Sequence, residues 1–376
     1  MAVYQNKTKQ LFFFLGNIYT VLYSLSCLTP FVHPKYFYGF TFLALLFPFL
    51  FAGMLLWLLI VFIFFRNRIW LYVLLLFLGY KNIFSVFSFH SKQPFSEVKQ
   101  NGTIRLLSWN VKDFTDSQIN SDTPGNPRRG IINFIKNSNA DIVCIQDYSE
   151  FKGPAFYSSI TDIKKAGNFS YHIFSIDSET KYPYALHQYG TTIFSKFPIV
   201  HSGIINYHPI NMQESLAFAD LVIGDDTVRI FNTHLQSMYL NFDYLKEGLD
   251  GVGEIEIPFL KIHTKAHERI RHYDLKHANQ AVFIKSVMDS TKIPFIFCAD
   301  LNSTPSSYVY HTLQKGLTDA FVSKGYGFGQ TYQNISPILR IDVVLMSKSL
   351  NPIQYTSPQL HCSDHFPIVT DIQLKQ

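Results

Sequence analysis

Asp300 and Asn302 follow directly on a short apolar run, residues 295–298, within the segment 294–305 (PFIFCADLNSTP). The apolar run predicts a buried strand that ends at the two polar residues. A strand that delivers a carboxylate and an amide to its exposed end can place a functional site on a rigid scaffold. An ordinary strand end is the alternative, because Asp and Asn also favour turns. The number of similar strand ends in the chain decides between these interpretations.

Polar side chains occupy the same position at the edges of several other apolar runs. Carboxylates and amides without cysteine suit a hard cation, Mg²⁺ or Mn²⁺, rather than zinc. Two histidines beside them can transfer protons near neutral pH. A divalent ion can polarise a phosphoryl oxygen while a carboxylate or an imidazole activates water, which is the equipment for attack at phosphorus. The set comprises Asn110, Asp147, His234, Asp300, Asn302, Asp342, Asp364 and His365.

Short apolar runs separated by turn residues carry these side chains from residue 102 onward. Many short strands with a few helices between them predict an α+β fold of two packed sheets flanked by helices. Helical spacing of apolar residues predicts helices over 129–136 and 263–288. The expected strands are 104–109, 141–145, 169–176, 190–194, 216–223, 228–232, 295–298, 341–346 and 366–372.

Three apolar runs precede this part of the chain, at residues 11–30, 40–65 and 69–89. Each is long enough, at about 20 residues, to cross a bilayer, so we expect three transmembrane helices. A cleaved signal peptide followed by core helices is the alternative. The expected organisation is a membrane anchor over 1–90, a polar linker over 91–101 and a catalytic domain over 102–376.

The orientation of the anchor follows from its Lys and Arg residues. Lys7 and Lys9 precede the first run, Arg66 and Arg68 lie between the second and third, and the loop between the first and second carries only Lys35. The positive-inside rule places the N-terminus and the 66–68 loop in the cytoplasm. A multi-pass protein of the cell membrane with three spans would then have its catalytic domain on the outer, extracytoplasmic side.

Charge and cysteine content add weaker constraints. The net charge of +5 gives little support for a polyanionic partner, and the basic start of the 263–288 helix, with Lys265, Arg269 and Arg271, could equally be a solvated face. None of the four cysteines has a CxxC or zinc-type spacing, and we expect no structural disulfide.

The order and context of the polar residues resemble the endonuclease/exonuclease/phosphatase superfamily, which includes DNase I, apurinic endonucleases, neutral sphingomyelinases and inositol phosphatases. The resemblance implies a four-layer αββα sandwich of the DNase I-like type, with the site at one end, and the preceding apolar runs look like those of membrane-anchored bacterial members. It covers residues 103–373 and rests on LLSWNV (106–111), DIVCIQD (141–147), GTTIFSKFPI (190–199), FNTHLQS (231–237), ADLNSTP (299–305), RIDVVL (340–345) and SDHFPI (363–368).

The same resemblance implies a metal site. By position in the motifs, Asn110 and Asp147 would hold Mg²⁺, or Mn²⁺, with help from Asp364. The superfamily normally has Gln-Glu where this chain has Gln146-Asp147. Because Asp reaches one methylene less far and Mg²⁺ tolerates little geometric error, Glu150 is an alternative ligand.

The resemblance also implies catalytic roles for five residues. Asp300 would orient and deprotonate the attacking water, and Asn302 would bind the scissile phosphate. His365 would act as the acid/base or phosphate-binding histidine, with Asp342 fixing its tautomer. His234 occupies the second histidine position of DNase- and sphingomyelinase-like members.

Simpler structural roles remain open for some of these residues. Asp342 could instead pair with Arg340, and His234 could cap its strand. Asp319 and Tyr332 also recur in similar proteins, and we interpret both as structural supports for the site.

The function expected from these observations is a membrane-anchored, divalent-metal-dependent phosphoesterase that hydrolyses phosphodiester bonds by in-line water attack. A nuclease is the first expectation, and a phospholipid or sphingomyelin phosphodiesterase or an inositol-type phosphatase is the alternative. The expected partners are nucleic acid or a phospholipid head group, and the bilayer through the N-terminal helices; no protein partner is inferred. A catalytically lapsed interaction protein, suggested by Asp147, is a second alternative. Aromatic residues that could line a lipid site are Tyr239, Phe242, Tyr244 and Phe259.

Overall fold

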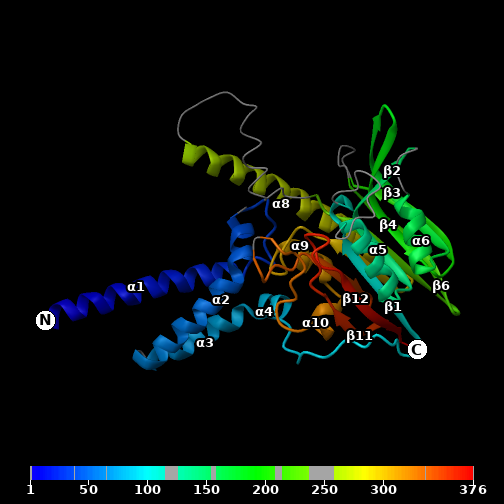
Figure 1. Cartoon of the computed structure of the whole chain (residues 1–376). Coiled ribbons are helices and arrows are strands. Elements are labelled where there is room, and N and C mark those ends of the chain that lie inside the picture. The colour runs from blue at the N-terminus through cyan, green and yellow to red at the C-terminus, as the bar shows by residue number, and fades with distance from the viewer. Residues whose placement is uncertain are drawn as a thin grey trace. The chain divides into compact units, whose positions relative to one another are not determined.

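The computed structural model describes residues 2–37, 39–64, 66–114, 126–153, 158–207, 214–236, 258–334 and 336–375 (Figure 1). The chain forms two compact units. One comprises Met1–Val86, Ser237–Ala281 and Ser303–Thr312, and the other comprises Phe87–Gln236, Val282–Asn302 and Leu313–Gln376. The first unit therefore contains more than the N-terminal apolar runs, and the expected domain boundaries stay a prediction.

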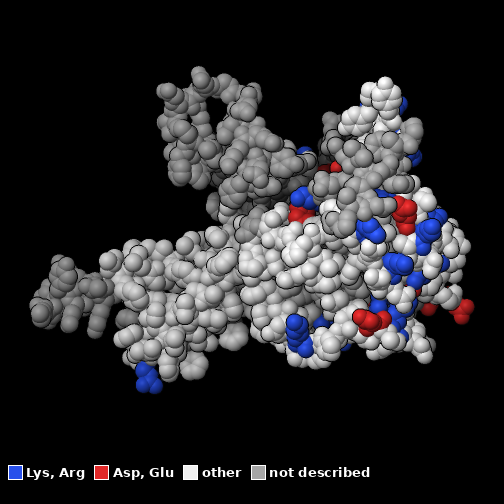
Figure 2. Space-filling model, viewed as in Figure 1, with Lys and Arg blue, Asp and Glu red and all other residues white. Residues whose placement is uncertain are grey.

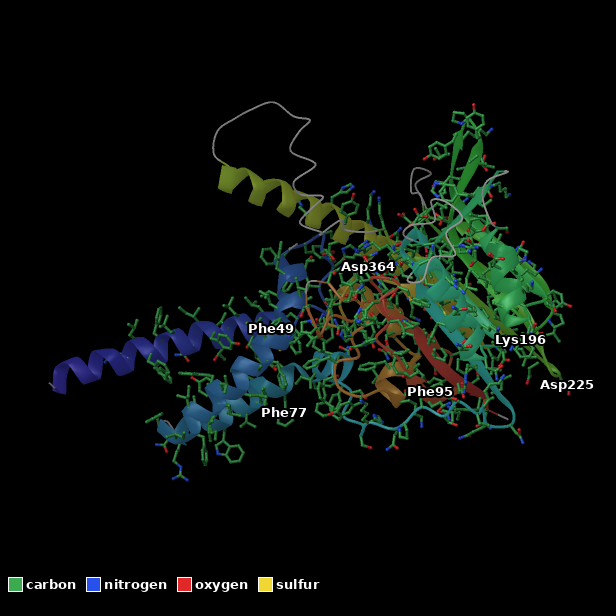
Figure 3. All side chains as sticks on the ribbon, viewed as in Figure 1. Phe49, Phe77, Phe95, Lys196, Asp225 and Asp364 are labelled. Atoms are coloured by element: carbon green, nitrogen blue, oxygen red, sulfur yellow. The ribbon has the colours of Figure 1, made fainter. Side chains whose placement is uncertain are left out.

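Helices make up the N-terminal part of the first unit. The second apolar run forms one long helix whose Phe49 is 58% exposed, and Phe77 on the next helix is 66% exposed. Both residues are labelled in Figure 3. Exposed apolar side chains of this kind mark a surface that contacts a membrane or another protein. The helices are α1 (Ala2–Ser26), α2 (Gly39–Phe64), the 3₁₀ turn η1 (Arg66–Arg68), α3 (Ile69–Leu78) and α4 (Tyr80–Val86).

The predicted number of three transmembrane helices is not confirmed. Among the described residues, α2 alone is long and apolar enough to cross a membrane, and α3 with α4 would add a second span only as a pair bent by 57°. The bend has a physical cause, because Gly79 separates the two helices and the Tyr23 hydroxyl donates to the carbonyl of Leu76 at 2.7 Å. A side chain on Gly79 would collide with that hydroxyl.

Two six-stranded sheets form the second unit, as the short apolar runs predicted. The first sheet has the order β11 (Leu350–Thr356), β12 (Ile368–Leu374), β1 (Thr103–Asn110), β2 (Ile142–Lys152), β4 (Ala185–Ser195), β3 (Tyr171–Tyr182). The second has the order β5 (Ile199–Asn206), β6 (Ser215–Ile223), β7 (Asp226–His234), β8 (Phe295–Asp300), β10 (Asp342–Met346), β9 (Thr318–Asp319).

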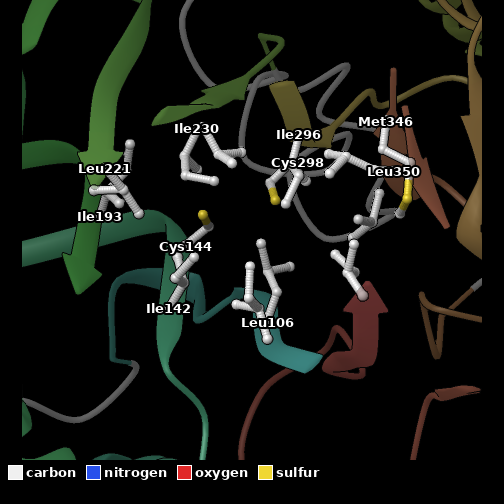
Figure 4. Close-up of a cluster of buried hydrophobic side chains, with 14 of the residues drawn as sticks. Leu106, Ile142, Cys144, Ile193, Leu221, Ile230, Ile296, Cys298, Met346 and Leu350 are labelled. Carbon is white, nitrogen blue, oxygen red and sulfur yellow. The ribbon is translucent and has the colours of Figure 1, made fainter. Parts of the chain in front are cut away.

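Alternating side chains from the two sheets form the core between them. Leu106 and Cys144 of the first sheet face Ile230 and Cys298 of the second, all fully buried (Figure 4). The four cysteines are free, as expected.

Helices cover the outer faces of both sheets. The helices α5 (Pro127–Ser138) and α6 (Ser159–Gly167) lie beside the first sheet (Figure 1). Ile131 and Ile135 of α5 and Ile163 of α6 pack on the outward side chains of β1, among them Trp109. On the second sheet, Phe283 of α8 (Pro258–Ser290) meets the ring of Tyr207, whose hydroxyl bonds Thr233 of β7. The layers thus run helix, sheet, sheet, helix.

Several elements differ from the expected ones. The strand expected at 190–194 is the end of the longer β4, and β5 was not predicted, because its half-exposed residues lack a continuous apolar run. The short helices α9 (Tyr308–Gln314) and α10 (Ala320–Lys324) were also not predicted.

A buried ion pair joins β1 to β12 and gives a stability prediction. Arg105 Nε and Nη2 lie 2.7 and 3.0 Å from the two carboxylate oxygens of Asp371, and both side chains are at most 2% exposed. Replacing Asp371 with alanine leaves a buried guanidinium without its counter-charge, so we expect a loss of about 3–5 kcal/mol in unfolding free energy. Thermal and denaturant unfolding measure this loss of unfolding free energy.

Asp289→Ala is the matched control, because Asp289 is a 63% exposed partner of Lys285. Surface pairs of this kind contribute about 0–1 kcal/mol. Equal losses in the two variants would contradict a structural role for the Arg105–Asp371 pair.

Candidate active site

Strand pairing in the second sheet aligns three of the predicted site residues in one row. His234 at the end of β7 is in register with Asp300 at the end of the parallel strand β8. Asp342, at the start of the antiparallel strand β10, lies opposite Asp300 on its other side. Because residues in register on neighbouring strands point to the same face, Asp300 lies between the other two. The strand end in the segment 294–305 is therefore the centre of the row.

Asn110 connects this row to the first sheet. It ends β1, and its Nδ2 donates to Asp300 Oδ2 at 2.9 Å and to Asp147 Oδ2 at 3.0 Å. Asn110 is buried, so both bonds are shielded from water. The side chain holds the carboxylates of two strands from different sheets at a fixed separation.

Asp147 reaches the site because β2 is irregular at this point. The register of β2 against β4 shifts between Ile145 and Tyr148, and Asp147 has a positive φ of 48°. A bulge re-aims one side chain, and such strained residues occur often at functional sites. Gln146 points the other way, into the core, where it donates to Ser108 Oγ and Asn232 Oδ1.

His365 and Asp342 form a hydrogen-bonded pair beside Asp300. His365 Nδ1 lies 2.9 Å from Asp342 Oδ2, and Nε2 lies 3.7 Å from Asp300 Oδ2. Burial opposes a charge on His365, but the carboxylates of Asp342 and Asp300 outweigh it and raise the pKa of His365 to about 9. Burial, together with the charge of Asp342, raises the pKa of Asp300 to about 6.

His234 forms a second histidine–carboxylate pair on the other side of Asp300. Its Nδ1 lies 2.9 Å from Asp147 Oδ1 and its Nε2 lies 3.6 Å from Asp300 Oδ2. Burial opposes its charge, yet Asp147 and Asp300 raise the pKa of His234 to about 10. In turn, although burial acts against ionisation, His234 holds the pKa of Asp147 well below its usual range.

Asn302 is fixed in a left-handed backbone conformation next to His234. Its φ is 46°, its N–H donates to Asp300 Oδ1 at 2.9 Å, and its Nδ2 donates to the carbonyl of Leu235 at 2.7 Å. The Nδ2 atom also lies 3.0 Å from His234 Nε2. These contacts hold the amide at the edge of the row.

Two groups could hold a cation. Ligand atoms of Asp300, Asp342 and His365 lie within 4.8 Å of one another, and Asp342 Oδ1 is buried with no hydrogen-bond partner among the described residues. Of the predicted ligands, Asn110 and Asp147 are in contact, whereas Asp364 Oδ2 pairs with Lys112 Nζ at 3.1 Å. Oxygen donors and an unpaired buried carboxylate oxygen fit a hard divalent ion.

Two side chains at the site were not predicted. The Tyr189 hydroxyl donates to Asp147 Oδ1, and Lys112, which has a positive φ of 48°, carries the ammonium group beside Asp364. Tyr189 directly precedes the 190–199 motif and Lys112 lies two residues after Asn110, so proximity to the motifs was the available signal.

The alternative of Glu150 as a metal ligand stays a prediction, whereas Arg340 pairs with Asp319 rather than with Asp342 as the structural alternative had it. Glu150 Oε2 accepts from Tyr148 Oη at 2.6 Å and from the Ile160 N–H of α6 at 3.2 Å, so this oxygen is held between β2 and α6. Arg340 Nη1 pairs with Asp319 Oδ2 at 3.0 Å, and Asp319 also accepts from the Phe321 N–H at 2.8 Å.

Asp319 therefore fixes the start of α10 and acts as the structural support expected of it. The Tyr332 ring packs tilted against the His365 ring, with 4.8 Å between the ring centroids and an angle of 56° between the ring planes.

Side chains proposed for substrate contact lie mainly outside the described residues. This applies to Lys265, Arg269, Tyr239, Phe242, Tyr244 and Phe259. Figure 2 shows Lys, Arg, Asp and Glu side chains of the sandwich mixed on the face in view, without a single-sign patch.

A sandwich of two six-stranded sheets with carboxylates, amides and two histidines at the strand ends defines a DNase I-like phosphoesterase fold. Residues 107–365 match the Endonuclease/Exonuclease/phosphatase family, and the chain belongs to this family. Its members are phosphodiesterases and phosphatases that usually use a divalent metal. Residues 9–86 match a domain of unknown function. No curated protein matches the chain.

Several solved structures are similar to the chain at low sequence identity. An endonuclease/exonuclease/phosphatase from Bacteroides vulgatus is 17% identical, with 72% of this chain and 99% of that chain covered and a TM-score of 0.50. A mannosyl-6-phosphatase from Bacteroides thetaiotaomicron has 17% identity, the same coverages and a TM-score of 0.48. TDP2 from D. rerio, complexed with single-strand DNA product, has 16% identity, coverages of 73% and 100%, and a TM-score of 0.48.

Proposed function

We propose that this protein is a membrane-anchored phosphoesterase that uses a divalent metal ion, Mg²⁺ or Mn²⁺, to hydrolyse phosphodiester bonds by in-line water attack. The single observation that carries the proposal is the position of Asp300. Its Oδ2 atom lies 2.9 Å from Asn110 Nδ2, 3.6 Å from His234 Nε2 and 3.7 Å from His365 Nε2. A carboxylate held among two imidazoles and an amide is arranged for proton transfer at a reacting centre.

Each residue then has a defined task. Asp300, with its pKa of about 6, orients and deprotonates water near neutral pH. His365 binds a phosphoryl oxygen or protonates the leaving oxygen, and Asp342 fixes its Nδ1–H tautomer at 2.9 Å. Asn302 and His234 donate to the phosphate and stabilise the charge that develops on it.

Asn110, Asp147 and Asp364 would hold the metal ion, which supplies a positive charge that polarises the phosphoryl oxygen. Asp147 is suited to this because His234 keeps its carboxyl group ionised. The contact between Asn110 and Asp147 places two oxygen-bearing side chains together before any ion binds.

The membrane anchor is part of the proposal. It is supported by the apolar helix α2 and by the exposed rings of Phe49 and Phe77. Arg66 and Arg68 lie at the turn between α2 and α3, which the positive-inside rule places in the cytoplasm. The segment 27–38 and α4 lie at the opposite ends of those helices in the chain, so residues after α4 would be extracytoplasmic.

Nucleic acid is the first candidate substrate, and the net charge of +5 gives it only weak support. A phospholipid head group is the second, and the specific observation in its favour is the apolar surface of α2 and α3, which would keep the site near a bilayer.

An activity panel on the full chain in lipid vesicles tests the proposal. The substrates are plasmid DNA, single-stranded DNA, RNA, sphingomyelin, phosphatidylinositol and an inositol phosphate, each with Mg²⁺, Mn²⁺ or EDTA. We expect DNA or RNA hydrolysis that EDTA lowers by about a hundredfold or more, since a metal ion contributes several kcal/mol to the transition state.

Hydrolysis of lipids alone would contradict the nuclease proposal and support a phospholipid head group as the substrate. Equal rates with EDTA would contradict the metal dependence. Activity on no substrate with either metal would favour the catalytically lapsed interaction protein.

A further inference from the structure

The segment that follows Asn302 is held by hydroxyl groups of the N-terminal helices. Thr29 Oγ1 donates to the carbonyl of Ser306 at 2.6 Å, and Ser85 Oγ donates to the carbonyl of Pro305 at 2.8 Å. Ser306 Oγ donates in return to the carbonyl of Ala44 in α2 at 2.6 Å. All these side chains are buried, so each bond satisfies a backbone group that has no access to water.

Asn82 of α4 links these bonds into one network. Its Nδ2 donates to the carbonyl of Ser26 at 3.0 Å and to Thr29 Oγ1 at 3.2 Å. Its Oδ1 lies 3.0 Å from Nε2 of His311 in α9. Burial keeps His311 neutral by lowering its pKa to about 3, so Nε2 can donate while the ring stays uncharged. Pro305, Ser306 and His311 of the 303–312 segment thus bond to the N-terminal part of the same compact unit.

This network exceeds what a membrane tether requires. A tether needs only a covalent linker, whereas here the loop between α1 and α2, the first turns of α2 and the helix α4 each bond a segment more than 200 residues away in the chain. The compact unit that contains the N-terminal helices accordingly includes Ser303–Thr312.

Ser303 is joined by a peptide bond to Asn302, whose backbone is in the left-handed region with a φ of 46°. Asparagine visits this region more readily than most residues with a side chain, because its short polar side chain can form local hydrogen bonds. The bonds to Asp300 and Leu235 support the entry side. Bonds from Thr29 and Ser85 restrain the exit side, because they fix the carbonyls three and four residues further on.

We propose that Thr29, Asn82 and Ser85 are positioning residues that act through the 303–312 segment to hold Asn302 in its phosphate-binding conformation. This inference rests on the proposed function for its effect on catalysis, but the restraint on the segment is a separate property that is measured without substrate.

The test uses the full chain in vesicles of neutral phospholipid. Thr29→Val combined with Ser85→Ala removes both hydroxyl donors at nearly unchanged volume, and Thr29→Ser restores one of them. Ser24→Ala is the matched control, because the Ser24 hydroxyl donates to Thr20 within α1 at 2.8 Å and does not contact the segment. Backbone hydrogen exchange over 303–312, kcat, KM and the thermal midpoint are measured for each.

We expect exchange over 303–312 to accelerate at least about tenfold in the double variant, with kcat reduced about tenfold and KM changed less than twofold. Ser24→Ala should match the unchanged protein, and Thr29→Ser in the Ser85→Ala background should recover most of both losses. A thermal midpoint lowered equally by Ser24→Ala and the double variant would indicate general loosening and overturn the inference.

Unchanged exchange over 303–312 overturns the inference whatever the activity. Faster exchange with unchanged kcat overturns the positioning role. If the unchanged protein hydrolyses no substrate, the proposed function fails, and the exchange measurement alone decides whether the helices restrain the segment.

Discussion

Asp342→Asn should lower kcat for phosphoester hydrolysis by about 10³-fold, because the pair that it forms with His365 fixes both the tautomer and the charge of the imidazole. Asp342 Oδ2 lies 2.9 Å from His365 Nδ1, and both side chains are buried, so water cannot replace the carboxylate. The substitution retains the shape of the side chain and removes its charge. Steady-state kinetics on the substrate identified by the activity panel measure the loss.

The pH dependence of the same variant provides a second readout. The Asp342 carboxylate is the foremost group that raises the pKa of His365 against burial. Without it, the pKa of His365 falls, and the protonated imidazole is lost at a lower pH. The alkaline limb of the pH–rate profile should therefore move to lower pH, whereas a purely structural defect would reduce the rate equally at every pH.

Two comparisons make the prediction specific. His365→Gln should cost a similar factor, and the double variant should be little worse than either single one, since residues that act as a unit are not additive. Asp319→Asn alters a buried carboxylate that pairs with Arg340 instead of a histidine, and it should change stability more than the pH profile. If the kcat loss of the double variant equalled the product of the two single losses, Asp342 and His365 would not act as a unit.

The strand ends were predictable from the sequence because an apolar run that stops at a polar residue has a local signature. Asp300, His234 and Asp342 were each placed correctly at the edge of a strand. Their alignment in one row depends on strand register, which joins residues 66 and 42 positions apart and leaves no local trace. The motif order of the superfamily supplied that long-range information.

Features that depend on distant contacts were not predictable. The bend at Gly79 requires the Tyr23 hydroxyl from another helix, so the run 69–89 looks like one continuous span in sequence. Arg340 stands two residues before Asp342, which suggested a pair, but its guanidinium reaches Asp319 instead. The bonds from Thr29 and Ser85 to the 303–312 segment likewise cannot be seen in either stretch alone.

Asp147 stands where the superfamily normally has Glu, and the proposed metal site depends on how its shorter side chain is placed. Asp147 lies at a register shift in β2 and has a positive φ, and its carboxylate contacts Asn110 and His234. The Tyr189 hydroxyl and His234 Nδ1 both contact Oδ1, while Oδ2 accepts from Asn110. The side chain is ionised and fixed in place.

Replacing Asp147 with asparagine is accordingly expected to abolish metal-dependent activity, a loss of at least about 10³-fold, because a neutral amide cannot offset the charge of a divalent ion. Mn²⁺ binding, followed by electron paramagnetic resonance, should weaken in parallel. Glu150→Gln is the matched control on the same strand: Glu150 bonds Tyr148 and the Ile160 N–H, so activity and Mn²⁺ affinity should stay near those of the unchanged protein. Full activity of Asp147→Asn would remove Asp147 from the site and leave the Asp300, Asp342 and His365 group to bind the ion.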